Sequence, residues 1–200
     1  MSLDYDTLRT TVSDYLDRSD LDSILPTFVE LAEAKFKRKL RHWKMEKRAT
    51  ADTVAGQRTL ALPDDFIEMR HLKLNTNPVT VLEYLVPAHI NYNASSSGIP
   101  SWYTVIGDEV HFDSTPDSVY QVEMYYYAFD ALSGSNLTNW LIEEHPDIYL
   151  YGTLLEAESF LMNDPRLQIW KLAFDEALKD LNRSSKIAHH AGAPLIMRAA

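Results

Sequence analysis

Cysteine is absent from this chain of 200 residues, and only six residues are glycine. The absence of cysteine excludes disulfides and Cys-ligated zinc sites, and it suits assembly in a reducing compartment. No glycine cluster precedes a Lys-Ser or Lys-Thr pair, which excludes the common phosphate-binding loop of nucleotide hydrolases. No Gly-x-Ser-x-Gly turn is present either, so the usual setting of a serine nucleophile is missing.

Long apolar runs are missing as well. No stretch approaches the roughly 20 apolar residues that a membrane-spanning helix needs. Residues 1–6 do not show the basic and then apolar layout of a secretion signal. We therefore expect a soluble protein that has no membrane partner and is not exported by a cleaved signal.

Positive charge is scarce over most of the chain but concentrated in one segment. The net charge is −10, which argues against a general nucleic-acid binder, because affinity for phosphates needs a basic surface. The composition, 46% apolar and 24% charged, is that of an ordinary globular protein. Eight of the nineteen basic residues nevertheless lie within fourteen positions. They are Lys35, Lys37, Arg38, Lys39, Arg41, Lys44, Lys47 and Arg48.

Apolar residues recur at helical spacing in the N-terminal part of the chain, residues 1–45, where we predict two helices. Asp4 or Asp6 can cap the first helix, and Pro26 suits the first turn of the second. The second helix is expected to be long and to carry the basic segment as far as Arg48.

Residues 46–137 change to short β-prone runs separated by Gly, Pro and Asn, which is typical of an antiparallel sheet. A hairpin is expected at Gly107-Asp108, because this dipeptide tolerates a positive φ. The predicted strands are Thr59 to Leu62, Phe66 to Leu74, Val79 to Leu85, Trp102 to Ile106, Glu109 to Phe112, and Tyr120 to Phe129.

Helical spacing returns in residues 138–186, where Pro146 suits the first turn of a helix that is apolar around much of its girth. Such a helix needs neighbours on more than one side. A last helix follows Pro165, and residues 187–200 are expected to form a C-terminal tail. We therefore predict an α+β fold, a four-helix bundle formed by N- and C-terminal helix pairs with an inserted antiparallel β-rich domain.

No set of residues points to catalysis, a metal or a cofactor, and we predict none of them. No two of the seven histidines are three to five residues apart, so solvated or capping roles are expected. Acidic pairs occur at 64–65, 108–109 and 143–144, where turns and helix starts explain them.

Two other functions remain open from the residues alone. One is a small ligand-binding or enzymatic domain with a pocket in the β segment. Its candidate lining residues are Trp102, Tyr103, His111 and Tyr126. The other is a helical DNA-binding regulator that uses the basic helix. Docking of this helix on an acidic patch of a neighbouring subunit is an equally good interpretation.

Three stretches carry a more specific pattern. Leu62 to Phe66 reads Leu-Pro-Asp-Asp-Phe, and Gly98 to Asp117 reads Gly-x-Pro, aromatic strand, Gly turn, strand and Pro-Asp. Asn139 to Arg166 covers an Asn-Trp-Leu start, a helix and an Asp-Pro-Arg turn before the last helix. In this order and spacing, the stretches resemble the phage head-to-tail adaptor proteins similar to the tail tubular protein A group.

The resemblance implies a non-enzymatic structural subunit of the virion, assembled in the host cytoplasm. It implies a homo-oligomeric ring, expected to be dodecameric, that binds the portal protein and the next tail or nozzle protein. Double-stranded DNA would pass through this ring without sequence-specific binding. The expected portal contact comprises Arg183, Lys186, Leu195, Ile196, Met197 and Arg198. The expected inter-subunit or DNA-facing contact on the basic helix comprises Lys35, Lys37, Arg38, Arg41, Lys44 and Arg48.

Overall fold

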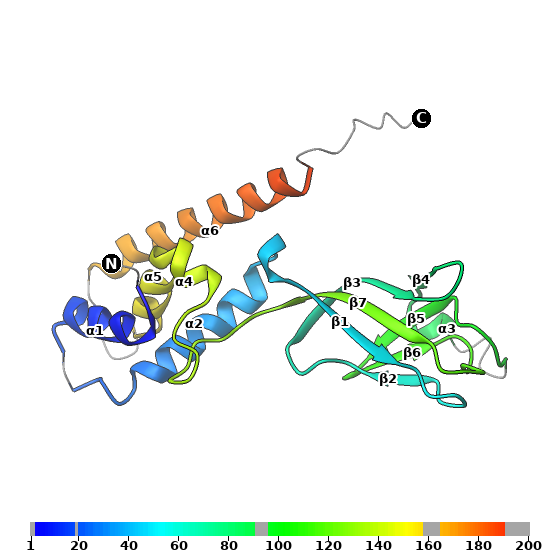
Figure 1. Ribbon diagram of the computed structural model, residues 1–200. Coiled ribbons are helices and arrows are strands. Elements are labelled where there is room, and N and C mark those ends of the chain that lie inside the picture. Colours follow the sequence, from blue (N-terminus) through cyan, green and yellow to red (C-terminus); the bar gives the residue numbers. More distant parts are fainter. Residues whose placement is uncertain (1–2, 19, 91–95, 158–164, 191–200) are drawn as a thin grey trace. The chain divides into compact units, whose positions relative to one another are not determined.

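The computed structural model describes residues 3–18, 20–90, 96–157 and 165–190. The chain divides into two compact units (Figure 1). The helical unit combines Met1–Lys44 with Asp130–Ala200, and the sheet unit is Met45–Phe129.

The helical unit is organised around one central helix. Its helices are α1 (Tyr5–Leu16), α2 (Leu25–Lys39), α4 (Trp140–Glu144), α5 (Pro146–Glu156) and α6 (Leu167–His190). Helix α5 contacts all four of the others (Figure 1). The buried side chains of α5 include Ile148, Tyr149 and Leu154. The prediction that this helix needs neighbours on more than one side is therefore confirmed.

The starts of these helices follow from local sequence. The Asp4 carboxylate accepts a hydrogen bond from the Thr7 backbone N–H at 2.8 Å, and the Thr7 hydroxyl accepts one from the Asp4 N–H at 2.7 Å. This reciprocal cap fixes the first turn of α1. Pro146 is in the first turn of α5, as predicted, and it separates α5 from the short helix α4.

A hydrogen-bonded set of polar side chains lies inside the helical unit. Glu33 on α2 is 3% exposed, and its Oε1 accepts hydrogen bonds from the Leu132 N–H at 2.7 Å and the Tyr149 hydroxyl at 2.8 Å. The Asn139 amide in turn donates to the Tyr149 oxygen at 2.6 Å. Burial raises the pKa of Glu33, and the two hydrogen bonds oppose this rise. The set connects α2, α5 and the segment that precedes α4.

Helices α2, α5 and α6 approach one another at Gly152. A Cβ atom at this position would lie 2.7 Å from Cζ of Phe36 and 3.2 Å from Cε2 of Phe174. The Phe36 ring is fully buried and packs edge-on against Tyr149, with 5.1 Å between the ring centroids. Glycine is therefore needed for close packing of the two helices that flank α5.

The sheet unit contains one curled, mixed sheet. Its strands are β1 (Glu46–Asp52), β2 (Thr59–Ala61), β3 (Phe66–Leu74), β4 (Thr80–Tyr84), β5 (Trp102–Ile106), β6 (Glu109–Phe112) and β7 (Gln121–Ala128). The spatial order is β1-β7-β3-β4-β5-β6-β2. Neighbouring strands are antiparallel except β4 and β5, which pair in parallel. Along the chain, the short helix α3 (Pro87–Ile90) comes between β4 and β5, and the 3-10 turn η1 (Trp43–Met45) precedes β1.

The two faces of strand β7 differ in character. Met124 and Tyr126 pack in the apolar core of the unit with Leu72 and Phe112. Because side chains alternate along a strand, Glu123, Tyr125 and Tyr127 point to the opposite face. We call it the second face. The side chains of β1 and β3 that pair in register with these residues lie on the same face.

The predicted four-helix bundle with an inserted antiparallel sheet is wrong. The described residues contain six α-helices, and in the helical unit four of them surround α5 instead of forming N- and C-terminal pairs. The sheet has seven strands and is mixed. The expected strands were located well, but β1 was missed because its four charged residues, such as Lys47, masked its alternation.

Candidate interaction surfaces

The basic segment does not form the single long helix that the sequence predicted. Helix α2 ends at Lys39, because the next residue, Leu40, has an extended backbone with ψ 137°. Lys35, Lys37 and Arg38 therefore lie on α2, and Arg41 and Lys44 follow it. Arg48 lies on β1, in the sheet unit. The physical reason is that the residues after Leu40 find other partners: residues 46–52 pair as strand β1 with β7, so the basic residues beyond Lys44 belong to the sheet.

Three of these basic residues meet residues from distant parts of the chain in an open cavity of about 350 Å³. We name it the basic groove. It is lined by Lys35, Arg38, Lys39, Leu155, Lys171, Phe174 and Asp175. The Lys39 ammonium lies 5.6 Å from the centroid of the Phe174 ring, and Lys35 forms an ion pair with Glu156. Lys171 was not identified from the sequence, because only folding brings α6 beside α2.

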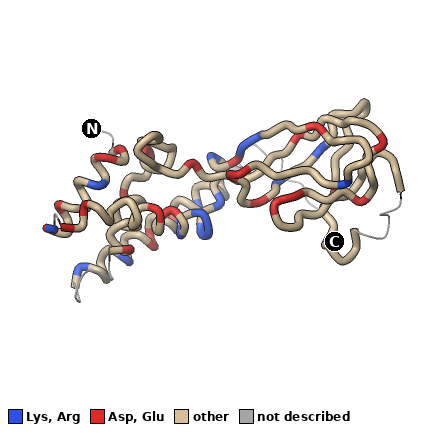
Figure 2. The backbone as a smooth tube through the Cα atoms, turned by 90° about the horizontal axis from the view of Figure 1, so that it is seen from below, with Lys and Arg blue, Asp and Glu red and all other residues tan. Residues whose placement is uncertain are grey.

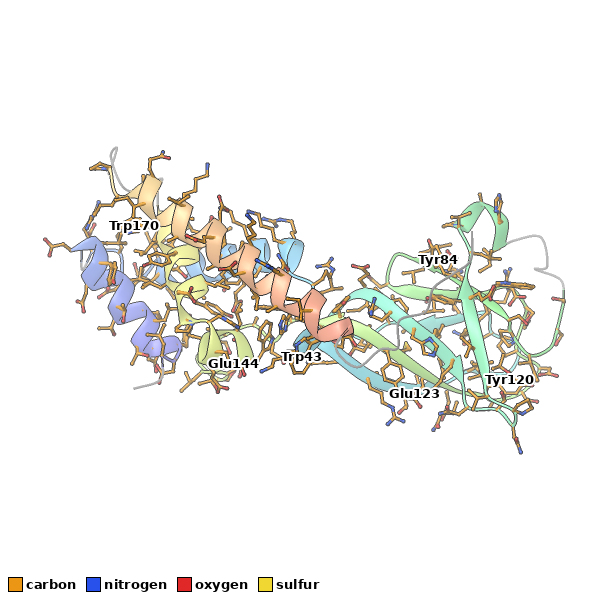
Figure 3. All side chains as sticks on the ribbon, turned by 90° about the horizontal axis from the view of Figure 1, so that it is seen from above. Trp43, Tyr84, Tyr120, Glu123, Glu144 and Trp170 are labelled. Atoms are coloured by element: carbon orange, nitrogen blue, oxygen red, sulfur yellow. The ribbon has the colours of Figure 1, made fainter. Side chains whose placement is uncertain are left out.

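Arg41 and Lys44 have contacts within the helical unit. The Arg41 guanidinium donates to the backbone oxygens of Lys37 at 2.8 Å and Leu40 at 2.7 Å, where α2 ends. Lys44 forms an ion pair with Glu144 and lies 5.3 Å from the centroid of the Trp43 ring (Figure 3). These two cations stabilise the region that follows α2, so they are less suited than Arg38 to contact a partner.

A charged cluster occupies the second face of the sheet unit, around Glu123 (Figure 3). The Glu123 side chain is 4% exposed, and its carboxylate accepts hydrogen bonds or ion pairs from Arg48 at 2.9 Å and Lys73 at 3.1 Å. The Tyr125 hydroxyl and the Asn75 amide also donate to it. These donors, the Tyr125 hydroxyl first among them, lower the pKa of Glu123 to about 2, against the opposing effect of burial.

The lowered pKa of Glu123 predicts how the sheet unit responds to acid. A carboxyl whose folded pKa lies below its unfolded value contributes stability above the unfolded value of 4.5, and the contribution is lost as pH falls towards 2. Glu123→Gln should therefore flatten the dependence of stability on pH in this window. Denaturant unfolding at several pH values, followed by circular dichroism, would measure it. Glu83→Gln, at an exposed position on β4, is the control, and parallel curves for Glu123→Gln and wild type would contradict the assignment.

The residues predicted for the portal contact lie at the end of α6 and beyond it. Helix α6 continues to His190, further than the sequence indicated, and Arg183 is exposed on it. Lys186 is on the same helix, but its side chain is outside the described residues, as are Leu195, Ile196, Met197 and Arg198 entirely.

The alternative pocket in the β segment is not assembled. Tyr103 and Tyr126 are buried in the core of the sheet unit, and the Tyr126 hydroxyl donates to Asp65 at 2.9 Å. Trp102 and His111 lie on the opposite face of β5 and β6, because Tyr103 pairs with Phe112 and side chains alternate. The four side chains therefore do not converge on one ligand.

Neither a metal cluster nor a membrane-spanning helix occurs in the described part of the chain. Over residues 3–18, 20–90, 96–157 and 165–190, no group of three or more His, Asp or Glu side chains is placed to hold a metal ion. No helix in the same ranges is both long and apolar enough to cross a bilayer.

Comparison with known proteins gives one result that covers nearly the whole chain. A family model described as SU10 adaptor protein matches residues 3–198. The match extends over both compact units, including the basic groove and the Glu123 cluster. No curated protein matches the chain.

Proposed function

Since the chain belongs to the SU10 adaptor protein family, a family of bacteriophage adaptors, we propose that it is a structural subunit of a head-to-tail connector. Several copies, twelve in this proposal, form a ring beneath the portal protein and extend the channel for double-stranded DNA. The observation that carries the proposal is the extent of the family match, which includes both units.

The charge of the chain supports a role beside passing DNA. A net charge of −10 gives a surface that repels phosphates on average, so DNA can move through the ring without being held. Sequence-specific DNA binding is not part of the proposal. The next tail or nozzle protein would bind on the sheet unit.

The portal contact is proposed at the C-terminal end of the chain, where Arg183 and Lys186 precede the apolar residues Leu195, Ile196 and Met197. A short apolar segment beside basic residues suits docking on another protein, because its apolar groups are buried only when the partner is present.

The test is to mix the purified protein with the portal protein of the same phage and to examine the sample by electron microscopy. A second ring, coaxial with the portal, is the expected result.

Truncation after Ala193 should reduce the fraction of portals that carry this ring at least about tenfold, which corresponds to a loss of about 1.4 kcal/mol. A control of unchanged length replaces residues 195–198 with Gly and Ser and should behave like the truncation. No association with an intact portal would refute the proposed function, and full docking of the truncated protein would refute the assignment of the portal contact.

A further inference from the structure

The helical unit carries opposite charges at the two ends of α2 (Figure 2). Residues 4–22 contain six aspartates and two arginines, and residues 35–44 contain six basic residues and no acidic one. We give the name acidic pole to the five aspartates of the first group that follow the cap residue Asp4: Asp6, Asp14, Asp17, Asp20 and Asp22. The second group includes the α2 side of the basic groove.

The acidic pole and the basic groove of one copy are separate features. Leu25 lines the hollow of the acidic pole, and the groove residues Lys35 to Lys39 lie about 15 to 21 Å further along α2, at 1.5 Å per residue. Both features are part of the helical unit, so no movement of the sheet unit changes this separation. Contact between them therefore requires two copies, and it is of the heterologous kind that closes into rings.

The two surfaces also match in their uncharged parts. Tyr15, which is 44% exposed, lies beside Asp14 and offers an aromatic ring to the partly exposed apolar side chain of Leu155 in the groove. The acidic pole has a hollow of about 280 Å³, lined by Asp6, Asp14 and Asp22 and by Arg9, which forms an ion pair with Asp6 at 3.9 Å and leaves Asp14 and Asp22 for a partner. A basic side chain from the rim of the neighbouring groove can enter this hollow. The contact thus combines charge with apolar burial, as protein interfaces do.

Two acidic residues make DNA a poorer occupant of the groove than an acidic protein segment. Asp175 lines the groove, and Glu156 pairs with Lys35 at its edge. Both carboxylates repel phosphates and aspartates alike, but a short protein segment can place its few carboxylates beside Arg38 and Lys171 and away from them, whereas the evenly charged DNA backbone cannot.

We propose that the acidic pole of each copy binds in the basic groove of the next copy, and that this contact joins the helical units around the ring. This inference rests on the proposed function for the existence of the ring, and it names the surfaces that form it. Lys35 is paired with Glu156 and Lys39 lies against the Phe174 ring, so Arg38 and Lys171 are the groove cations best suited to the neighbouring copy. Asp14 and Asp22 of the acidic pole are their counterparts.

Charge reversal on either surface is the first test. One variant carries Arg38→Glu with Lys171→Glu, and the other carries Asp14→Lys with Asp22→Lys; all four residues are exposed. Each variant alone should form the ring on the portal at least about tenfold less well, because like charges now face each other. Lys179→Glu and Glu176→Lys, at exposed positions on α6 outside the groove, are the matched controls. Thermal unfolding by circular dichroism verifies that every variant is folded.

Mixing the two charge-reversed variants tests whether the acidic pole pairs with the basic groove. An equimolar mixture of the two variants should regain ring assembly, because each reversed pole then meets a reversed groove and each native pole a native groove. A chain with all four substitutions should assemble as well. Loss of assembly in the single-surface variants without recovery in the mixture would overturn the inference, and so would unchanged assembly of either variant.

A second measurement separates this inference from the proposed function. Zero-length carbodiimide cross-linking joins carboxylates to amines, and a mixture of ¹⁴N- and ¹⁵N-labelled full-length protein shows which cross-links connect different copies. Cross-links from residues 14–22 to Lys39 or Lys171 between copies are expected, and they should decrease with added salt. Rings on the portal without these cross-links would overturn the inference and leave the connector role intact. Cross-links without any portal association would contradict the connector role instead. Reduced DNA binding of the groove variant with normal ring formation would assign the groove to DNA and overturn the inference.

Discussion

Gly152→Ala is expected to lower the free energy of unfolding of the helical unit by about 1–3 kcal/mol, the usual range for overpacking a core. The new Cβ would lie 2.7 Å from Cζ and 2.9 Å from Cε1 of Phe36. The Phe36 ring cannot easily move away, because it is fully buried between Tyr149 and Phe174. Alanine would otherwise favour an exposed helix by about 1 kcal/mol over glycine, so a measured loss shows that the clash outweighs propensity.

A double-mutant cycle tests the cause of this loss. Phe36→Leu removes the two ring atoms that would clash with the new Cβ, at the cost of a cavity. We therefore expect Gly152→Ala to cost much less in the Phe36→Leu background, as measured by urea unfolding. Gly134→Ala is the matched control in the same unit, since a Cβ there meets nothing within 4 Å. Equal costs of Gly152→Ala in both backgrounds would mean that Phe36 is not the obstacle.

Tyr149→Phe should destabilise the helical unit by about 1.5–3 kcal/mol at pH 7, the range for a buried hydrogen bond to a charged group. The substitution removes the hydroxyl that donates to Glu33 at 2.8 Å and accepts from Asn139 at 2.6 Å. Only the Leu132 N–H would then remain of the two donors to Glu33 Oε1. The ring itself is retained, so packing against Phe36 stays the same.

The cost of Tyr149→Phe should depend on pH. Burial already raises the pKa of Glu33, so ionisation of this group opposes folding, and its stability contribution is fully present only below the unfolded pKa. Loss of the Tyr149 donor raises the folded pKa further, and the destabilisation should be smaller at pH 5 than at pH 7. In a Glu33→Gln background the cost should be smaller and independent of pH. Tyr151→Phe, two residues along α5, is the control; an equal effect of pH on both tyrosine variants would disprove the role assigned to Glu33.

Much of the local structure was predictable because it depends on neighbouring residues. The strands at 66–74, 102–106 and 109–112 were predicted to the residue, and the hairpin at Gly107 was confirmed, with a φ of 61°. Of the two cap candidates, Asp4 and Asp6, the structure shows Asp4, and the proline start at Pro146 was also confirmed. Each of these signals acts within about one turn or one strand, so the sequence contains them completely.

The parallel pairing of β4 and β5 could not be predicted from such signals. Residues 80–84 and 102–106 read equally well as partners in an antiparallel sheet. The connection between them, which includes helix α3, brings Glu83 beside Trp102 in parallel register. Strand direction is thus decided by the path of the connection and by packing of the whole unit.

The basic groove, too, was predictable only in part from the sequence. Basic residues such as Lys35 and Arg38 were identified from their density along the chain, and the sequence suggested that they contact a neighbouring subunit. Lys171, Leu155 and Phe174 complete the groove from other helices, more than 100 residues away in sequence. No local pattern links these positions, because their proximity results from the packing of α2 and α6 on α5.

The sequence by itself determined the composition class, the local start and turn signals, most strand positions and the resemblance to phage adaptors, which the family match confirmed. Only the tertiary structure decided the arrangement of the helices around α5, the mixed sheet and the division of the basic segment at Leu40. The physical reason is range. Caps, turns and alternation depend on groups a few residues apart, whereas burial and pairing depend on contacts between segments that the chain brings together only when it folds.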